Sequence, residues 1–144
     1  MKKIYLVTNN DKKVDVAKNA LLKYGIEVEK LPMDTPEIQA QTAEEVVRYS
    51  VKYASEQSQK AVIKGDVALH VDSLGGFPGP FVKFINKWLN ADHFSRMLGS
   101  ESQAKFIDAL GYCEPGKEPV CFVTETTGKI ITTPSGDNGN MVDS

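Results

Sequence analysis

Apolar residues in the first part of the chain alternate between short strand-like runs and helical spacing. Residues 4–8 are a short run of β-forming side chains that ends in polar turn residues, which predicts a strand and a loop. In residues 14–25 the apolar side chains recur at helical spacing until a glycine stops them, which predicts an amphipathic helix. Residues 26–31 favour a second strand, and residues 42–54 favour a second helix that opens with a Thr42–Glu45 capping box.

The middle of the chain contains a third strand and a sharp turn. Residues 61–71 are largely apolar, with an interruption at Lys64-Gly65-Asp66, and predict a strand. The glycine and proline cluster in residues 74–80 is typical of a tight, specific turn. Two further strands, near residues 106–113 and 120–126, are separated by a turn sequence and predict an antiparallel hairpin.

Two helices are predicted between the sharp turn and the hairpin. Residues 81–89 return to a helical period, and residues 94–98 carry a second short helix before a glycine. Phe81, Phe84 and Trp88 lie at helical spacing. We therefore expect these aromatic side chains to pack in the core rather than to form a stacking platform for a base.

Composition and charge narrow the function. The 144 residues are 41% hydrophobic, which is enough for the core of one compact unit. Lysine and arginine number 17 against 19 acidic residues, a net charge of −2 without a polybasic run, which argues against a nucleic-acid binder. No stretch has the length and hydrophobicity of a signal peptide or a membrane span, so we expect a cytoplasmic protein.

The loop after the first predicted strand is a candidate phosphate site. Residues 8–13, Thr-Asn-Asn-Asp-Lys-Lys, lie between a strand and a helix. Free backbone N–H groups and the positive end of the helix favour an anion at such a place, and Lys12 and Lys13 add positive charge. The segment lacks the Walker pattern, so an ordinary polar connection remains the alternative.

Three carboxylates stand at predicted loop or strand ends. They are Glu37 after Pro36, Asp66 after Gly65, and Asp143 near the terminus. Hard oxygen ligands of this kind suit Mg²⁺, which usually binds one or two carboxylates together with phosphate oxygens. A single acidic residue is more often a solvated surface group, so each carboxylate alone is weak evidence.

Motifs in a fixed order resemble those of the inosine triphosphate pyrophosphatase family. Residues 8–13 are similar to the family's Thr-Gly-Asn-x-x-Lys nucleotide loop, and Pro36-Glu37-Ile38-Gln39 matches its Pro-Glu-Ile-Gln segment. Residues 65–80 align without gaps on its acidic pair and its Leu-Gly-Gly-x-Pro-Gly turn. The match continues through Lys83 and residues 127–130, so the resemblance covers essentially the whole chain.

The resemblance implies a fold and an activity. The fold would be α/β, with a long twisted mixed sheet, flanking helices, and two lobes around a central cleft. Residues 1–144 would be a single pyrophosphatase-like domain that lacks the family's C-terminal elements. The activity would be Mg²⁺-dependent hydrolysis of non-standard purine nucleoside triphosphates (ITP, XTP or dITP) to monophosphate and pyrophosphate. Members of the family commonly pair, so we also expect a homodimer.

The resemblance also implies roles for individual residues. Four side chains would hold or contact the triphosphate: Thr8, Asn10, Lys13 and Lys83. Glu37 and Asp66 would bind Mg²⁺ or orient the attacking water, and Asp143 would approach the base. These roles agree with phosphoryl chemistry, which depends on positioning and on neutralising oxyanion charge.

Three features depart from the family pattern. Gly65 stands where the family has a second acid beside Asp66, Asn9 replaces a glycine, and the family chain runs on beyond Ser144. Three hypotheses therefore stay open. The chain is an active pyrophosphohydrolase, a catalytically impaired nucleotide-binding relative, or an incomplete gene product whose exposed edge is covered by self-association.

Overall fold

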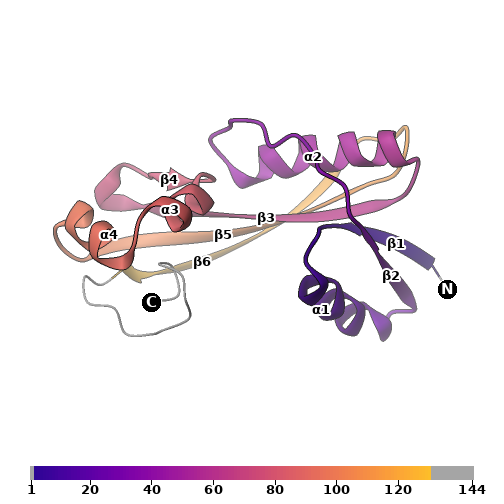
Figure 1. Ribbon diagram of the computed structural model, residues 1–144, viewed down its shortest axis with the longest axis horizontal. Coiled ribbons are helices and arrows are strands. Elements are labelled where there is room, and N and C mark those ends of the chain that lie inside the picture. The colour runs from indigo at the N-terminus through magenta and orange to yellow at the C-terminus, as the bar shows by residue number, and fades with distance from the viewer. Residues whose placement is uncertain (1, 131–144) are drawn as a thin grey trace. The chain divides into compact units, whose positions relative to one another are not determined.

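A computed structural model describes residues 2–130 of the chain (Figure 1). The elements, in chain order, are β1 (Lys2–Val7), α1 (Asp11–Leu22), β2 (Ile26–Leu31), α2 (Ala43–Ser58), β3 (Val62–Val71), a 3₁₀ turn (Asp72–Leu74), β4 (Pro78–Gly79), α3 (Val82–Trp88), α4 (Ala91–Leu98), β5 (Ser102–Cys113) and β6 (Val120–Ile130).

The strands form one mixed sheet. They lie in the order β2-β1-β3-β5-β6, with β4 paired to β3. β1 runs parallel to β2 and β3, whereas β4 runs antiparallel to β3, so the predicted mixed α/β sheet with helices is confirmed.

The last two strands are longer than the sequence pattern predicts. β5 begins at Ser102 and β6 reaches Ile130. Ser102 and Ala104 are buried while the residues beside them are exposed, so small residues, rather than bulky apolar ones, occupy the inward positions at the start of β5. β5 and β6 are neighbours joined by residues 114–119, a connection too short for a parallel crossover, which confirms the predicted hairpin.

The described chain divides into two compact units. The first contains the residues up to Ala40 together with Glu44–Asp66 and Ala109–Val123, and the second contains Gln41–Ala43, Val67–Asp108 and the chain from Thr124. β3, β5 and β6 contribute residues to both units. The single domain and the central cleft that the resemblance implies stay predictions.

The core of the first unit has two layers, because successive side chains of a strand point to opposite faces. In Figure 1, α1 lies against β1 and β2. The layer on the side of α1 is formed by Ile4, Leu6, Val14, Val28 and Ile63. The layer on the side of α2 is formed by Val7, Val51, Ala54, Val62 and Cys113. α2 packs so closely on β5 that a Cβ at Gly111 would overlap Val47.

The core of the second unit lies beneath the sharp turn and the two short helices. Its buried members are Leu69, Val71, Val82, Phe94, Leu98 and Ala104. His70 Nδ1 lies 3.0 Å from the Gly76 carbonyl oxygen, and the His70 ring lies against Gly79, whose φ of 58° suits glycine. His70 therefore supports the turn.

The expected core packing of the aromatic residues of α3 is wrong. Trp88 is 72% exposed and Phe84 is 47% exposed. The buried side of this helix instead carries Val82, with Ile85 and Leu89 packed against the same core. Both sets of residues have helical spacing and differ by one position, so periodicity alone does not decide which set faces inward.

Candidate functional site

The strand register brings three predicted segments to one edge of the sheet. Val7 of β1 is paired with Leu31 of β2, and Leu6 is paired with Ile63 of β3. Because these strands are parallel, the loop after β1, the loop after β2, and residues 64–66 continue past these pairs on the same side. Ligands of α/β sheets bind outside the carboxyl ends of parallel strands. This edge of the first unit is therefore the candidate site.

The loop after β1 is held in shape by its own side chains. The Thr8 hydroxyl oxygen accepts a hydrogen bond from the Asn10 backbone N–H at 3.1 Å. Asn10 is the N-cap of α1, and its Oδ1 accepts from the backbone N–H groups of Lys12 and Lys13 at 3.0 and 3.4 Å. The Thr8 hydroxyl proton and the Asn10 side-chain NH₂ remain donors that a phosphate oxygen can use.

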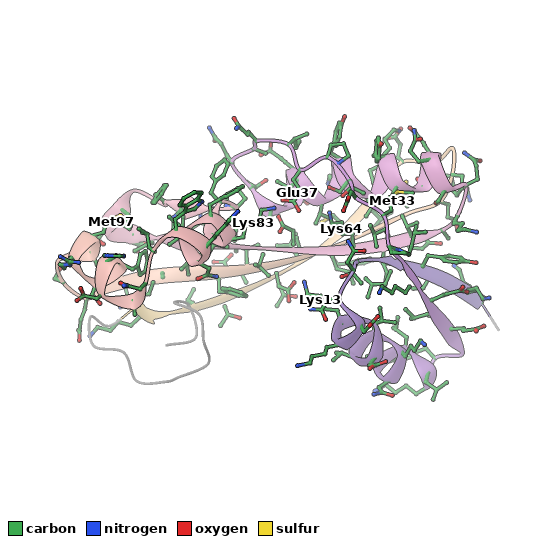
Figure 2. The ribbon with its side chains drawn as sticks, viewed as in Figure 1. Lys13, Met33, Glu37, Lys64, Lys83 and Met97 are labelled. Atoms are coloured by element: carbon green, nitrogen blue, oxygen red, sulfur yellow. The ribbon has the colours of Figure 1, made fainter. Side chains whose placement is uncertain are left out.

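Charge around this loop favours an anion. Lys13 lies in the first turn of α1 and is exposed (Figure 2). The Lys30 ammonium donates a hydrogen bond to Asp11 at 2.8 Å and holds the pKa of that carboxyl below its ordinary value. The negative charge of Asp11 is thus compensated within the protein, so it opposes a phosphate at the positive end of the helix less strongly.

The loop after β2 presents Glu37 at the same edge. The Ser50 hydroxyl of α2, which is fully buried, donates a hydrogen bond to the Pro36 carbonyl oxygen at 3.2 Å. This bond fixes the backbone next to Glu37. The Glu37 side chain is 42% exposed, so its carboxylate remains accessible from solvent.

Lys64 of β3 reaches this loop and was not predicted as a site residue. Its Nζ lies 2.6 Å from the Thr35 hydroxyl oxygen and 3.9 Å from Glu37 Oε1, and its side chain is only 17% exposed. Figure 2 shows Lys64 on the strand with Glu37 on the loop beside it. The only hint in the sequence was a lysine inside a largely apolar strand, a position where lysine is uncommon.

Asp66 and Gly65 occupy opposite faces of β3. Alternation along the strand places Asp66 on the same face as Lys64, and Gly65 on the other face. The φ angle of Gly65 lies outside the left-handed region. A Cβ built at Gly65 would have the Ala109 carbonyl oxygen as its nearest neighbour, at 3.7 Å, an ordinary contact distance. The structure therefore has room for a side chain where the family has its second acid.

The structure places the predicted site residues as follows. Five of them belong to the first unit: Thr8, Asn10, Lys13, Glu37 and Asp66. Lys83 belongs to the second unit, where it lies in the first turn of α3 with its Nζ 5.2 Å from the centre of the Phe84 ring. Asp143 lies outside the described residues.

The donors at this edge fit a magnesium ion that arrives with phosphate. Within residues 2–130, no three His, Cys, Asp or Glu side chains are grouped as a complete metal site would need. Glu37 and Asp66 instead offer two carboxylates from one loop and one strand. Mg²⁺ commonly binds one or two carboxylates and completes its shell with water and substrate phosphate oxygens, so this donor set suits such an ion.

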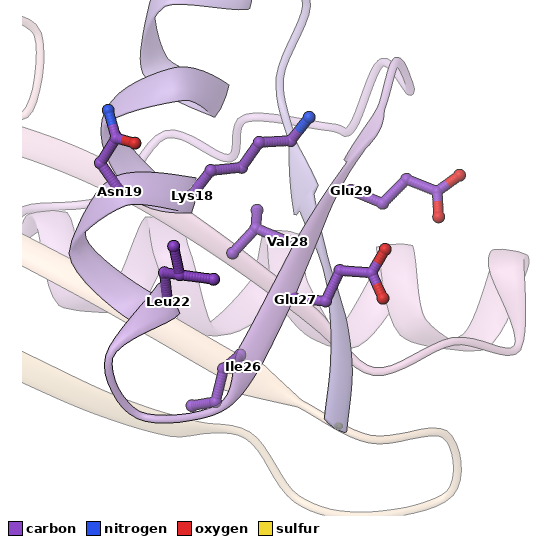
Figure 3. Close-up of a pocket in the computed structure, with 7 residues that line it drawn as sticks. All are labelled: Lys18, Asn19, Leu22, Ile26, Glu27, Val28 and Glu29. Carbon is purple, nitrogen blue, oxygen red and sulfur yellow. The ribbon is translucent and has the colours of Figure 1, made fainter.

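A cavity of about 520 Å³ lies elsewhere in the first unit (Figure 3). It opens between α1 and β2, which is an edge strand of the sheet. Its lining is Lys18, Asn19, Leu22, Ile26, Glu27, Val28 and Glu29. None of the predicted site residues lines it.

Among the described residues, no helix has the length and hydrophobicity needed to cross a membrane.

Relatives of this chain are named as nucleoside triphosphate pyrophosphatases. A dITP/XTP pyrophosphatase of Methanopyrus kandleri is 37% identical over 139 residues, which cover 95% of this chain and 74% of the relative. An inosine triphosphate pyrophosphatase of Puccinia graminis f. sp. tritici is 34% identical over 140 residues, which cover 90% of this chain and 71% of the relative.

A solved structure shares the fold of this chain. A HAM1 protein from Coxiella burnetii superposes with a TM-score of 0.83 at 21% identity, covering 97% of this chain and 78% of that one. The sequence model of the Ham1 family matches residues 4–144. Together with the relatives above, this match confirms the resemblance to the inosine triphosphate pyrophosphatases. The chain belongs to the Ham1 family.

Proposed function

We propose that this protein is a hydrolase that cleaves non-standard purine nucleoside triphosphates (ITP, XTP or dITP) to the monophosphate and pyrophosphate. The observation that carries the proposal is the 37% identity to a dITP/XTP pyrophosphatase over 95% of the chain. The first unit supports it, because the loop after β1 and the segments that carry Glu37 and Asp66 lie at the same edge of the sheet. That edge is where such sheets bind ligands.

In this proposal, the first unit holds the triphosphate by its phosphates. The Thr8 hydroxyl, the Asn10 side-chain NH₂ and the Lys13 ammonium donate to phosphate oxygens in front of the positive end of α1. Lys83 of the second unit is proposed as a further phosphate contact, and Asp143 as a contact to the base. Both assignments rest on the family resemblance.

The products define the anhydride that is hydrolysed. Because they are a monophosphate and pyrophosphate, it is the anhydride between the α- and β-phosphates. In this proposal, water attacks the α-phosphorus, the bond from that phosphorus to the bridging oxygen breaks, and pyrophosphate leaves with this oxygen. In this proposal, the Asp66 carboxylate accepts a hydrogen bond from this water and takes its proton. Glu37 and Asp66 would hold Mg²⁺, which would supply positive charge to neutralise the charge that develops on the leaving oxygen.

We further propose a cytoplasmic homodimer that does not bind nucleic acid. The dimer is supported by exposed apolar side chains on neighbouring strands of the first unit: Leu110 of β5 and Val120 and Phe122 of β6. Among residues 2–130, β6 is also the last strand of the sheet, and an exposed edge favours pairing with another chain. Light scattering that shows a monomer at micromolar concentration contradicts the dimer.

A pyrophosphate-release assay tests the activity directly. The full chain is incubated with ITP, XTP, dITP and ATP, with and without Mg²⁺, and pyrophosphate is measured against a no-enzyme control. The proposal requires Mg²⁺-dependent release that is faster for the non-standard purines than for ATP. Release at the control rate with all four nucleotides overturns it.

A second candidate function is nucleotide binding without rapid turnover. It is favoured by Gly65, which leaves Asp66 as the single acid at that point of β3. The same nucleotides separate the two functions, because a binding protein shows heat of binding in calorimetry without releasing pyrophosphate.

A further inference from the structure

Lys64 stands apart from the other paired lysines of the first unit. Four others, Lys3, Lys30, Lys52 and Lys117, each form an ion pair, and their side chains are 42%, 34%, 42% and 71% exposed. The side chain of Lys64 is 17% exposed. A lysine gives up water only where partners replace it, so the position of this ammonium is set by its contacts.

Two of those contacts lie on the loop that carries Glu37. The ammonium donates a short hydrogen bond to the Thr35 hydroxyl, at 2.6 Å, and lies 3.9 Å from Glu37 Oε1. The loop is itself fixed by the hydrogen bond from the buried Ser50 to the Pro36 carbonyl. Strand and loop therefore hold the positive charge against this carboxylate, rather than leaving it to a freely moving side chain.

A divalent cation that binds Glu37 lies close to the positive charge of Lys64. It needs the same carboxylate oxygens, and it is repelled by an ammonium a few ångströms away, an interaction that solvent screens only in part at so little exposure. The resemblance suggested metal ligands here, but it gave no reason to expect a fixed positive charge beside one of them.

We propose that Lys64 is a built-in counter-ion of Glu37 that competes with a divalent cation for this carboxylate and thereby lowers the metal affinity of the nucleotide-free site. The inference deepens the proposed function, because it rests on the role of Glu37 as a metal ligand. It predicts that the free protein binds metal weakly and that removing the ammonium strengthens binding.

The test is Mn²⁺ binding to the nucleotide-free protein, followed by the electron paramagnetic resonance signal of free Mn²⁺. Lys64→Met keeps the apolar stem and removes the charge, and Lys64→Gln also removes the charge but keeps a donor for Thr35. We expect both variants to bind Mn²⁺ at least about tenfold more tightly than the wild type, because a nearby like charge is gone. Thermal unfolding establishes that each variant is folded.

Two controls separate the local effect from a change in net charge. Lys60→Met removes one positive charge from the same unit at a lysine whose ammonium lies over the Tyr5 ring, and it is expected to leave Mn²⁺ affinity unchanged. Adding Glu37→Gln to Lys64→Met is expected to abolish the gain, since the carboxylate at issue is then neutral.

Three results overturn the inference. They are an unchanged or weaker affinity in the Lys64 variants, an equal gain in Lys60→Met, and a gain that survives Glu37→Gln. The proposed function is judged separately, by pyrophosphate release from the wild type. Release without any effect of Lys64 on metal affinity rejects the counter-ion and leaves the enzyme, whereas tighter Mn²⁺ binding without release keeps the counter-ion and rejects the enzyme.

Discussion

The loop after β1 and the first part of β3 hold positive charge in different ways. Lys13, at the start of α1, is exposed. Lys64, by contrast, is mostly covered and lies between the Thr35 hydroxyl and the Glu37 carboxylate. An exposed ammonium is available to an incoming anion, whereas a covered one first compensates a charge of the protein itself.

This difference assigns the two halves of the proposed site to different tasks. The loop after β1 offers donors and a positive helix end, which suit binding. The segment from Lys64 to Asp66, together with Glu37 on the loop after β2, offers two carboxylates, and the Lys64 ammonium partly compensates the charge of Glu37. This arrangement suits chemistry at a metal-bound phosphate. Changes at β3 are therefore expected to alter turnover, and changes at the loop to alter affinity.

The largest expected effect is at Asp66. Asp66→Asn removes the only acid in the Lys64–Asp66 segment of β3, so we expect pyrophosphate release to fall by about a hundredfold or more. Binding of the nucleotide to the loop is expected to change much less. Asp15→Asn, on the exposed surface of α1, is the matched control and should keep the wild-type rate. Unchanged turnover in Asp66→Asn removes this residue from the chemistry.

Affinity is expected to depend on Lys13. Lys13→Ala removes a charge-assisted contact to phosphate and should weaken triphosphate binding by about 1 to 3 kcal/mol. Calorimetry with the triphosphate measures this change, and Lys18→Ala, further along the same helix, serves as the control. Equal affinity of Lys13→Ala and the wild type shows that the loop does not hold the phosphates.

Local features of the first unit could be predicted from the sequence. The strand and the turn residues after it are encoded within a few consecutive positions, and the loop between β1 and α1 follows from them. The position of Glu37 and Asp66 at one edge depends on which strands are neighbours. The strand order was not predicted, because periodicity within a strand does not specify its partners.

The features that the sequence did not reveal depend on contacts between distant segments. Lys64 is separated from Glu37 by the whole of α2, so nothing near either residue indicates that they meet. The prediction of which side of α3 faces the core was wrong for a related reason. Both Phe84 and Val82 fit a helical stripe, and only packing against residues of β3 and α4 decides between them. Long-range packing, rather than local propensity, was the missing information.

A carboxylate at position 65 is expected to raise turnover more than it changes binding of the nucleotide. Gly65→Glu places a carboxylate on a strand position with an ordinary φ and no close neighbour, so the free energy of unfolding should change little. If an acid at this position holds the metal or activates water, Mg²⁺-dependent pyrophosphate release should rise by about tenfold or more.

The control for this gain is Gly65→Gln, which adds a side chain of the same size without the charge. A gain in both variants indicates an effect of packing, and no gain in a folded Gly65→Glu shows that this position is not part of the catalytic centre. Denaturant unfolding of each variant establishes whether the fold is kept.

The smallest expected effect concerns the charge balance of the loop. The hydrogen bond from Lys30 lowers the pKa of Asp11 from its ordinary value of 3.8. Since the folded-state pKa lies below that of the unfolded chain, the pair stabilises the fold above the unfolded pKa, and this contribution is lost as the pH falls through the folded pKa.

Lys30→Met tests this charge balance. The substitution should return the pKa of Asp11 toward its ordinary value, which NMR titration of the Asp11 carboxyl carbon follows, and Lys18→Met is the control. The change in unfolding free energy should be small and should shrink in high salt, because Asp11 is 84% exposed. Triphosphate affinity should also fall slightly in Lys30→Met, since Asp11 is then uncompensated beside the phosphates, and an Asp11 pKa that does not move rules out this compensation.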